Sequence, residues 1–171
     1  MKKLLEYIVK RAMPLITVMI VLLGTQVTAQ DFDKGLEAYD NKDYTSAYRE
    51  WMPLAVKGDA DAQRNIGMLT AAGFGVEQDN AEALKWFRLS AEQGDGGAQA
   101  NLGMMYQYGH GVPQDNKTAV KWYRKVAEQG GFWGHEALGS MYEYGKGVLK
   151  DNSLAHMWYN ISSANGDENA E

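Results

Sequence analysis

A period of 36 residues restricts the fold of this chain more than any other feature of its sequence. GFGVEQDN begins at Gly73, GHGVPQDN begins at Gly109 and GKGVLKDN begins at Gly145. Further positions hold one residue type in all three copies without a gap, namely Gly67, Gly75, Val76, Asp79, Ala83, Trp86 and Gly94 with their equivalents 36 and 72 residues later. Periods of about 20–50 residues are typical of arrays in which each unit buries its apolar face against the next.

Each copy is predicted to contain two helices joined by the glycine-rich loop. In the first copy, residues 62–72 form the first helix (helix A) and residues 80–94 form the second (helix B). Gly73 suits a left-handed C-cap of helix A. Asp79 suits the N-cap of helix B, where Glu82 would complete a capping box. The alternative interpretation of the glycines is a phosphate-binding loop, but no strand precedes them and the GxxxxGKS/T pattern is absent.

Two recurrent features predict how these helices pack. Helix B carries a stripe at the spacing i, i+3, i+4, i+7 and i+8, made of Ala83, Trp86, Phe87, Ser90 and Ala91. This spacing places the stripe on one helical face. The recurrent tryptophans are therefore interpreted as core residues, not as stacking platforms for sugars or bases. A mid-helix glycine such as Gly67 costs about 1 kcal/mol relative to alanine, so its recurrence predicts that another backbone approaches closely there.

The segment before the first copy carries a reduced version of the pattern. Four of its positions match residues 36 positions later: Ala47, Ala55, Gly58 and Asp59 correspond to Ala83, Ala91, Gly94 and Asp95. The shorter DNKD segment replaces the glycine loop. Residues 30–60 are therefore predicted to form an N-terminal capping helix pair, which helical arrays need.

The first 29 residues have the order of a secretory signal peptide. Lys2, Lys3, Lys10 and Arg11 precede the apolar run of residues 12–24, and the small residues Val27 and Ala29 follow. This order predicts cleavage near Ala29. The apolar run is too short to cross a hydrocarbon core of about 30 Å as a helix. An uncleaved anchor is the alternative.

Charge and composition limit the classes of partner. Cleavage removes four basic residues and Glu6, which changes the net charge from −5 to −8. Nucleic acid is not expected as a partner, because phosphate binding needs a basic surface. The processed chain is expected to be periplasmic or secreted, without stable membrane insertion. The sequence has no cysteine, which excludes disulfides and thiolate chemistry.

The repeated residues resemble those of the Sel-one-like repeat (SLR) family, which is related to the tetratricopeptide (TPR) repeats. The resemblance implies an all-α, right-handed superhelical solenoid of antiparallel helix pairs. It divides the chain into the signal peptide (1–29), the capping pair (30–60), repeats at 61–96, 97–132 and 133–168, and a tail at 169–171. Within the pattern, Thr70, Gly134 and Ser163 depart from the residue types at equivalent positions. The tail stops where a further helix A would begin, which predicts either truncation or pairing with another molecule.

The resemblance also implies a function: a non-catalytic scaffold or adaptor of the bacterial cell envelope that binds a protein or peptide on its concave face. If Ile66 marks the centre of the buried side of helix A, the opposite side is the candidate binding stripe. The predicted partner-binding residues are Asn65, Met68, Asn101, Met104, Gln107, Tyr108, Ser140, Glu143 and Tyr144, with Glu136 on the same side. The alternative is that this stripe packs against helix A of the next repeat.

Catalysis, metals and cofactors have little support in the sequence. His110, His135 and His156 show no i, i+4 pairing, so no metal site is predicted. No cofactor is expected. Some cysteine-rich relatives are linked to β-lactams, but this chain lacks those cysteines and has no SxxK motif. The alternative function is a cell-envelope hydrolase acting on β-lactam or peptidoglycan. The basic residues at 117, 121, 124 and 125 are interpreted as a solvated outer face.

Overall fold

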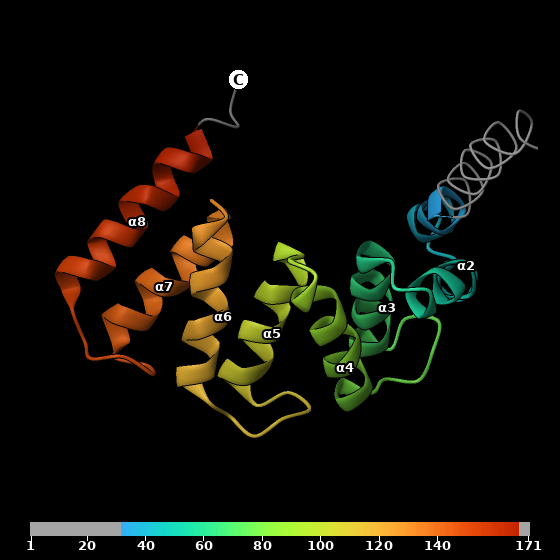
Figure 1. The fold of residues 1–171 in the computed structure, drawn as a ribbon, viewed down its shortest axis with the longest axis horizontal. Coiled ribbons are helices and arrows are strands. Elements are labelled where there is room, and N and C mark those ends of the chain that lie inside the picture. Colours follow the sequence, from blue (N-terminus) through green and yellow to red (C-terminus); the bar gives the residue numbers. More distant parts are fainter. Residues whose placement is uncertain (1–31, 168–171) are drawn as a thin grey trace, which may run out of the picture.

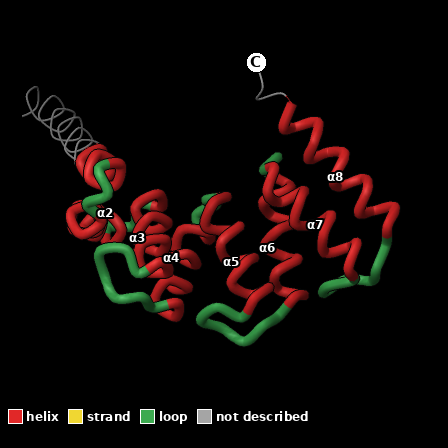
Figure 2. The backbone as a smooth tube through the Cα atoms, turned by 180° about the vertical axis from the view of Figure 1, so that it is seen from behind, coloured by secondary structure: helices red, strands yellow, loops and turns green. Residues whose placement is uncertain are grey.

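The computed structural model describes residues 32–167, and these fold into an all-α array of antiparallel helix pairs (Figure 1). Residues 32–40 are helical. The helices that follow are α2 (Tyr44–Val56), α3 (Ala60–Ala72), α4 (Asn80–Glu92), α5 (Gly96–Tyr108), α6 (Asn116–Glu128), α7 (Phe132–Tyr144) and α8 (Asn152–Asp167). They form a curved row in which loops join successive helices (Figure 2). The predicted solenoid of antiparallel pairs is confirmed.

The described part of the chain excludes both predicted terminal segments. The signal peptide at 1–29 and the tail at 169–171 lie outside residues 32–167. The segment predicted as a capping pair consists of the helix at 32–40 and α2. Trp51 of α2 connects the two helices, because its indole N–H donates to the Phe32 carbonyl at 3.1 Å. Within residues 32–167, no helix has both the length and the apolar character that crossing a membrane requires.

The helix caps follow the sequence prediction at all three loops. Gly73, Gly109 and Gly145 are the C-caps of α3, α5 and α7, with φ of 71°, 75° and 65°. Asp79 accepts from the backbone N–H groups of Ala81 and Glu82, each at 2.9 Å. Asp115 and Asp151 cap α6 and α8 in the same way. These contacts satisfy amides that the first helical turn leaves without partners.

The predicted capping box at Asp79 is wrong. Its second half requires the Glu82 side chain to accept from the Asp79 backbone N–H. That N–H donates instead to the Thr70 carbonyl at 3.0 Å, and Glu82 pairs with Lys85 at 2.8 Å. The end of helix A therefore holds the start of helix B directly, through a backbone hydrogen bond across the loop.

The core consists of three clusters, each between helix B of one pair and helix A of the next. They join α2 with α3, α4 with α5, and α6 with α7. Trp86, Trp122 and Trp158 are partly buried, and each packs against the cluster that precedes it. The tryptophans therefore join successive pairs, as a core assignment requires, while Phe87 beside Trp86 is fully buried.

The mid-helix glycines face aromatic rings and not backbone, so the expectation of a close backbone approach there is wrong. A Cβ atom on Gly67 would lie 2.8 Å from a ring carbon of Phe87. Gly103 faces the ring of Tyr123, and Gly139 faces that of Tyr159. Such distances are shorter than real Cβ contacts allow, so glycine recurs because helix B inserts an aromatic ring against helix A.

The close backbone approach occurs at the second glycine of each loop. Gly75 has φ of 71°, and a Cβ atom on it would lie 2.5 Å from the carbonyl carbon of Tyr44, the first residue of α2. Gly111 and Gly147 lie in the same way against Asn80 and Asn116, the first residues of α4 and α6. Each loop therefore packs on the N-terminal end of helix B of the preceding pair. The glycines of the loop therefore serve the stacking of repeats, which agrees with the prediction of a structural loop and not with a phosphate-binding loop.

Candidate partner-binding groove

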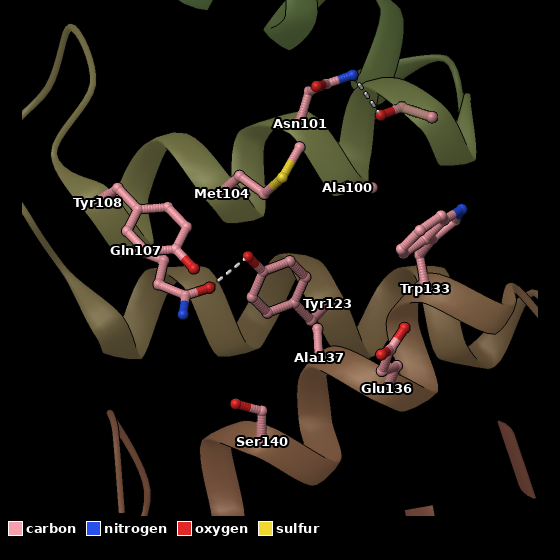
Figure 3. A pocket seen from close by; sticks show the side chains of 11 residues that line it. Ala100, Asn101, Met104, Gln107, Tyr108, Tyr123, Trp133, Glu136, Ala137 and Ser140 are labelled. Atoms are coloured by element: carbon pink, nitrogen blue, oxygen red, sulfur yellow. Dashed lines mark hydrogen bonds between the residues drawn. The ribbon is translucent and has the colours of Figure 1, made fainter. Parts of the chain in front are cut away.

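A cavity of about 490 Å³ lies between α5 and α7, with α6 at its floor (Figure 3). We call it the α5–α7 groove. Residues that line it are Gly97, Ala100, Asn101, Met104, Gln107 and Tyr108 of α5, Tyr123 of α6, and Trp133, Glu136, Ala137 and Ser140 of α7. The groove therefore separates helix A of two consecutive repeats.

The α5 wall combines an exposed apolar stripe with engaged amides. Gly97, Ala100, Met104 and Tyr108 follow one another at helical spacing, so they share a face. Met104 is 45% exposed and Tyr108 59% exposed. The Asn101 side chain lies on the same wall and donates to the Gly97 carbonyl at 3.0 Å. This wall offers adaptable apolar contact area to an incoming chain.

The floor is a buried hydroxyl–amide pair. Tyr123 is 3% exposed and donates its hydroxyl to Oε1 of Gln107 at 2.6 Å (Figure 3). Burial raises the pKa of Tyr123 well above that of an exposed tyrosine. The loop fixes Gln107 further, because Gln114 donates to its backbone carbonyl at 2.7 Å. The floor is therefore rigid and polar beneath walls that are mostly apolar.

The α7 wall carries the most exposed aromatic residue of the groove and its one charged side chain. Trp133 is 70% exposed and packs edge-to-face on Phe132, with ring centroids 5.6 Å apart. Glu136 lies one turn further on α7, and among the residues lining the groove it alone is ionisable to a carboxylate. In Figure 3 the side chains of Trp133 and Glu136 lie at the same end of the groove, near Ala100. Ser140 lies on the wall beyond them.

The structure brings together five of the nine predicted partner-binding residues. Asn101, Met104, Gln107, Tyr108 and Ser140 all line the α5–α7 groove. The gathered residues include both buried and exposed side chains. Their role in binding a partner stays a prediction.

The other four predicted residues lie elsewhere. Asn65 of α3 is 9% exposed, so it offers little surface, whereas Met68 one turn later is exposed. Glu143 accepts from the hydroxyl of Tyr159 at 2.8 Å. Tyr144 is 63% exposed, with the Lys146 ammonium 5.7 Å from its ring centroid. The stripe predicted on helix A is thus divided between packing and exposed surface.

Five residues that line the groove were not predicted from the sequence, namely Gly97, Ala100, Tyr123, Trp133 and Ala137. Trp133 stands where the other repeats have Asp61 and Gly97, so a large aromatic residue at a position outside the recurrent set was the available signal. Ala100 stands where α3 has Arg64, which is a difference in size that opens the groove. Tyr123 was assigned to the core stripe, and its hydroxyl gave no indication of a floor.

The histidines and the basic residues of α6 lie outside the α5–α7 groove. His110 is exposed in its loop, His135 is buried with its ring stacked on Trp158 at 5.8 Å, and His156 is exposed. Among residues 32–167, no three His, Asp or Glu side chains gather as metal ligands would. On α6, Lys125 lies over the Trp122 ring at 4.7 Å. The basic residues of α6 line a separate pocket together with Glu128.

The fold and the groove define a helical repeat protein that has an open surface between its A helices. The chain belongs to the Sel1 repeat family: the family model matches residues 60–95, 97–131 and 134–167. Proteins with this repeat generally mediate protein interactions. The match identifies a repeat scaffold and no catalytic family. No curated protein matches the chain.

Two solved structures are similar to this chain. One is a protective antigen present in uropathogenic Escherichia coli strains that displays an SLR fold, with 38% identity, a TM-score of 0.77, and coverage of 84% of this chain and 32% of that one. The other is a Sel1 repeat protein from Oxalobacter formigenes, with 34% identity, a TM-score of 0.74, and coverage of 81% and 57%. The chain thus spans about a third and somewhat over half of their lengths.

Proposed function

We propose that this chain is a non-catalytic interaction scaffold of the bacterial cell envelope, and that it binds an extended segment of a protein partner in the α5–α7 groove. The observation that carries the proposal is the groove itself, which is large enough for several side chains. Its exposed Met104, Tyr108 and Trp133 offer apolar area, and its amide and hydroxyl groups can bond to a peptide backbone.

Localisation forms the second part of the proposal. The basic, apolar and small residues of positions 1–29 support export and cleavage near Ala29, so the processed chain is periplasmic or secreted. Its acidic charge argues for a protein partner over nucleic acid.

The hydrolase alternative has less support. Hydrolysis of a glycan uses two carboxyl groups on either side of the scissile bond, whereas Glu136 is the one carboxylate among the residues that line the groove. Turnover of nitrocefin or of muropeptides, lost on a single point change, would overturn the non-catalytic proposal.

Photo-crosslinking in intact cells tests binding and localisation together. A photo-crosslinking amino acid replaces Met104 in the groove or, as a control, Leu89 on α4, because the two are 45% and 46% exposed. We expect a discrete adduct from position 104, none from position 89, and recovery of the adduct from the periplasm or the medium.

The variant Ala100→Arg narrows the groove and leaves the residue at position 104 unchanged. It should weaken the position-104 adduct. Equal adducts from both positions, or none from position 104, would contradict binding in the groove. Recovery of only uncleaved protein in the membrane fraction would contradict the localisation.

A further inference from the structure

The interval between α3 and α5 contains a cationic side chain of the protein itself, the guanidinium of Arg64. Nη1 of Arg64 contacts Oδ1 of Asp61 at 2.8 Å and also contacts Oδ2 of Asp95. The stem of Arg64 lies over Gly97, where a Cβ atom would be 2.9 Å from Cδ of the arginine. The guanidinium thus crosses the interval from one A helix to the start of the next, and its side chain is only 27% exposed.

The α5–α7 groove lacks this cation at the equivalent place. Ala100 stands in the register of Arg64, and Gly131 stands in that of Asp95. The α7 wall provides Trp133 in the register of Gly97 and Glu136 in that of Arg64 itself. In the groove the arginine of the α3 wall is thus replaced by an alanine on the α5 wall, and the facing α7 wall adds a carboxylate and an exposed aromatic ring.

Glu136 has no cationic partner among the residues that the structure describes. It takes part in none of the ion pairs found among residues 32–167. Trp133 precedes it by three residues, and residues at this spacing are neighbours on a helix. A carboxylate beside an exposed indole provides the two groups that attract a cationic side chain, by charge and by the electron-rich face of the ring.

We infer that the segment bound in the α5–α7 groove carries a lysine or arginine, whose stem lies against Trp133 and whose charged end pairs with Glu136. This inference rests on the proposed function. The partner then supplies the cation that Arg64 supplies within the preceding interval. The net charge of −5 of the chain favours the approach of such a basic segment.

A peptide selection tests the inference. A random octapeptide library displayed on phage is panned against the full chain and against Glu136→Gln, Glu136→Arg and Trp133→Ala. The control is Glu92→Gln, which removes an exposed carboxylate of α4 that is not among the residues lining the groove. Circular dichroism checks that each variant is folded, and the isosteric Glu136→Gln change decides the result.

We expect the wild-type chain to enrich sequences with lysine or arginine at one fixed position, and Glu136→Arg to enrich aspartate or glutamate there. A synthetic peptide of the enriched sequence should bind Glu136→Gln about two- to fivefold more weakly, because an exposed ion pair contributes only modestly. Trp133→Ala should lower its affinity by at least about fivefold, because exposed aromatic residues at a binding site contribute strongly. Glu92→Gln should leave it unchanged.

Each other result has a defined meaning. Enriched peptides without a basic residue, whose binding falls with Trp133→Ala, would overturn the cation while leaving the groove as a peptide site. Basic peptides whose binding is indifferent to Glu136→Gln would overturn the inference as well. No enrichment, or enrichment unaffected by any groove variant, would overturn the proposed function along with it.

Discussion

The α3–α5 interval and the α5–α7 groove are built on the same helical frame but differ in the side chains that line them. Arg64 crosses the first interval to Asp95, the residue that caps α5 by accepting from the Ala98 N–H at 2.6 Å. In the second interval Ala100 takes the place of Arg64, and Gly131, the N-cap residue of α7, provides no side-chain cap. The first interval still keeps a cavity of about 440 Å³ lined by Ala71, Phe87 and Met104, so Arg64 and Asp95 do not close the whole interval.

The floors of the two intervals differ in the same coordinated way. In the second, the hydroxyl of Tyr123 requires an acceptor, which Gln107 provides. In the first, Phe87 has no hydroxyl and Ala71 stands in the register of Gln107. The frame of glycines and caps thus stays constant while pairs of residues change together.

The largest expected effect comes from removing the hydroxyl of the floor. Tyr123→Phe leaves Oε1 of Gln107 buried without its donor, which should lower the free energy of unfolding by about 1–2 kcal/mol. The double variant Tyr123→Phe/Gln107→Ala copies the Phe87–Ala71 pair and should recover part of this loss. Urea unfolding measures both. If Tyr123→Phe is as stable as the wild type, the Tyr123–Gln107 hydrogen bond does not contribute to stability.

The same variant changes the response to high pH. A tyrosine in the unfolded chain loses its proton near pH 10, whereas burial keeps the folded Tyr123 protonated to higher pH, and the pKa of Tyr159 rises to about 12 through desolvation and its bond to Glu143. The unfolded state then binds fewer protons, so stability falls as pH rises above about 10. Tyr123→Phe should make this fall less steep.

A smaller effect is expected from opening the first interval. Arg64→Ala removes a partly buried ion pair and should lower the free energy of unfolding by about 1 kcal/mol. Arg49→Ala is the matched control, since Arg49 pairs with Glu50 at 3.4 Å on the surface with a side chain 73% exposed. The control should change stability by less than about 0.5 kcal/mol. If the two variants lose the same free energy of unfolding in urea, the contact of Arg64 across the interval contributes no more than a surface ion pair.

The smallest effect on stability is expected from closing the second interval. Ala100→Arg places a cation within the groove that holds Glu136, and it should change the free energy of unfolding by no more than about 0.5 kcal/mol. Peptide binding measured by fluorescence anisotropy should nevertheless fall sharply. Ala81→Arg on the exposed side of α4 serves as the control. Unchanged binding in Ala100→Arg would place the peptide elsewhere.

The sequence predicts those features that depend on neighbours close in the chain. Helix ends were predictable at Gly73 and Asp79 because a cap is satisfied within a few residues. The ring opposite Gly67 was not, because Phe87 lies 20 positions away on another helix. A mid-helix glycine indicates that another part of the chain packs closely on the helix, but it does not identify that part.

The groove was predictable only in part for a similar reason. Periodicity placed Met104 and Tyr108 on the right face of helix A. It could not show that Asn65 is buried, nor that the groove opens where Ala100 replaces Arg64, because these depend on side chains that meet across two repeats. The division of one stripe into packing and surface is a property of the stacked array.

The contact of Gly75, Gly111 and Gly147 with the first residues of α2, α4 and α6 has a consequence for evolution of binding. Because main chain meets main chain there, exchange of side chains at other positions leaves the step from one repeat to the next unchanged, whereas a side chain in place of one of these glycines would force the backbone to shift. A ligand long enough to span several repeats must therefore carry its anchoring groups at that invariant interval.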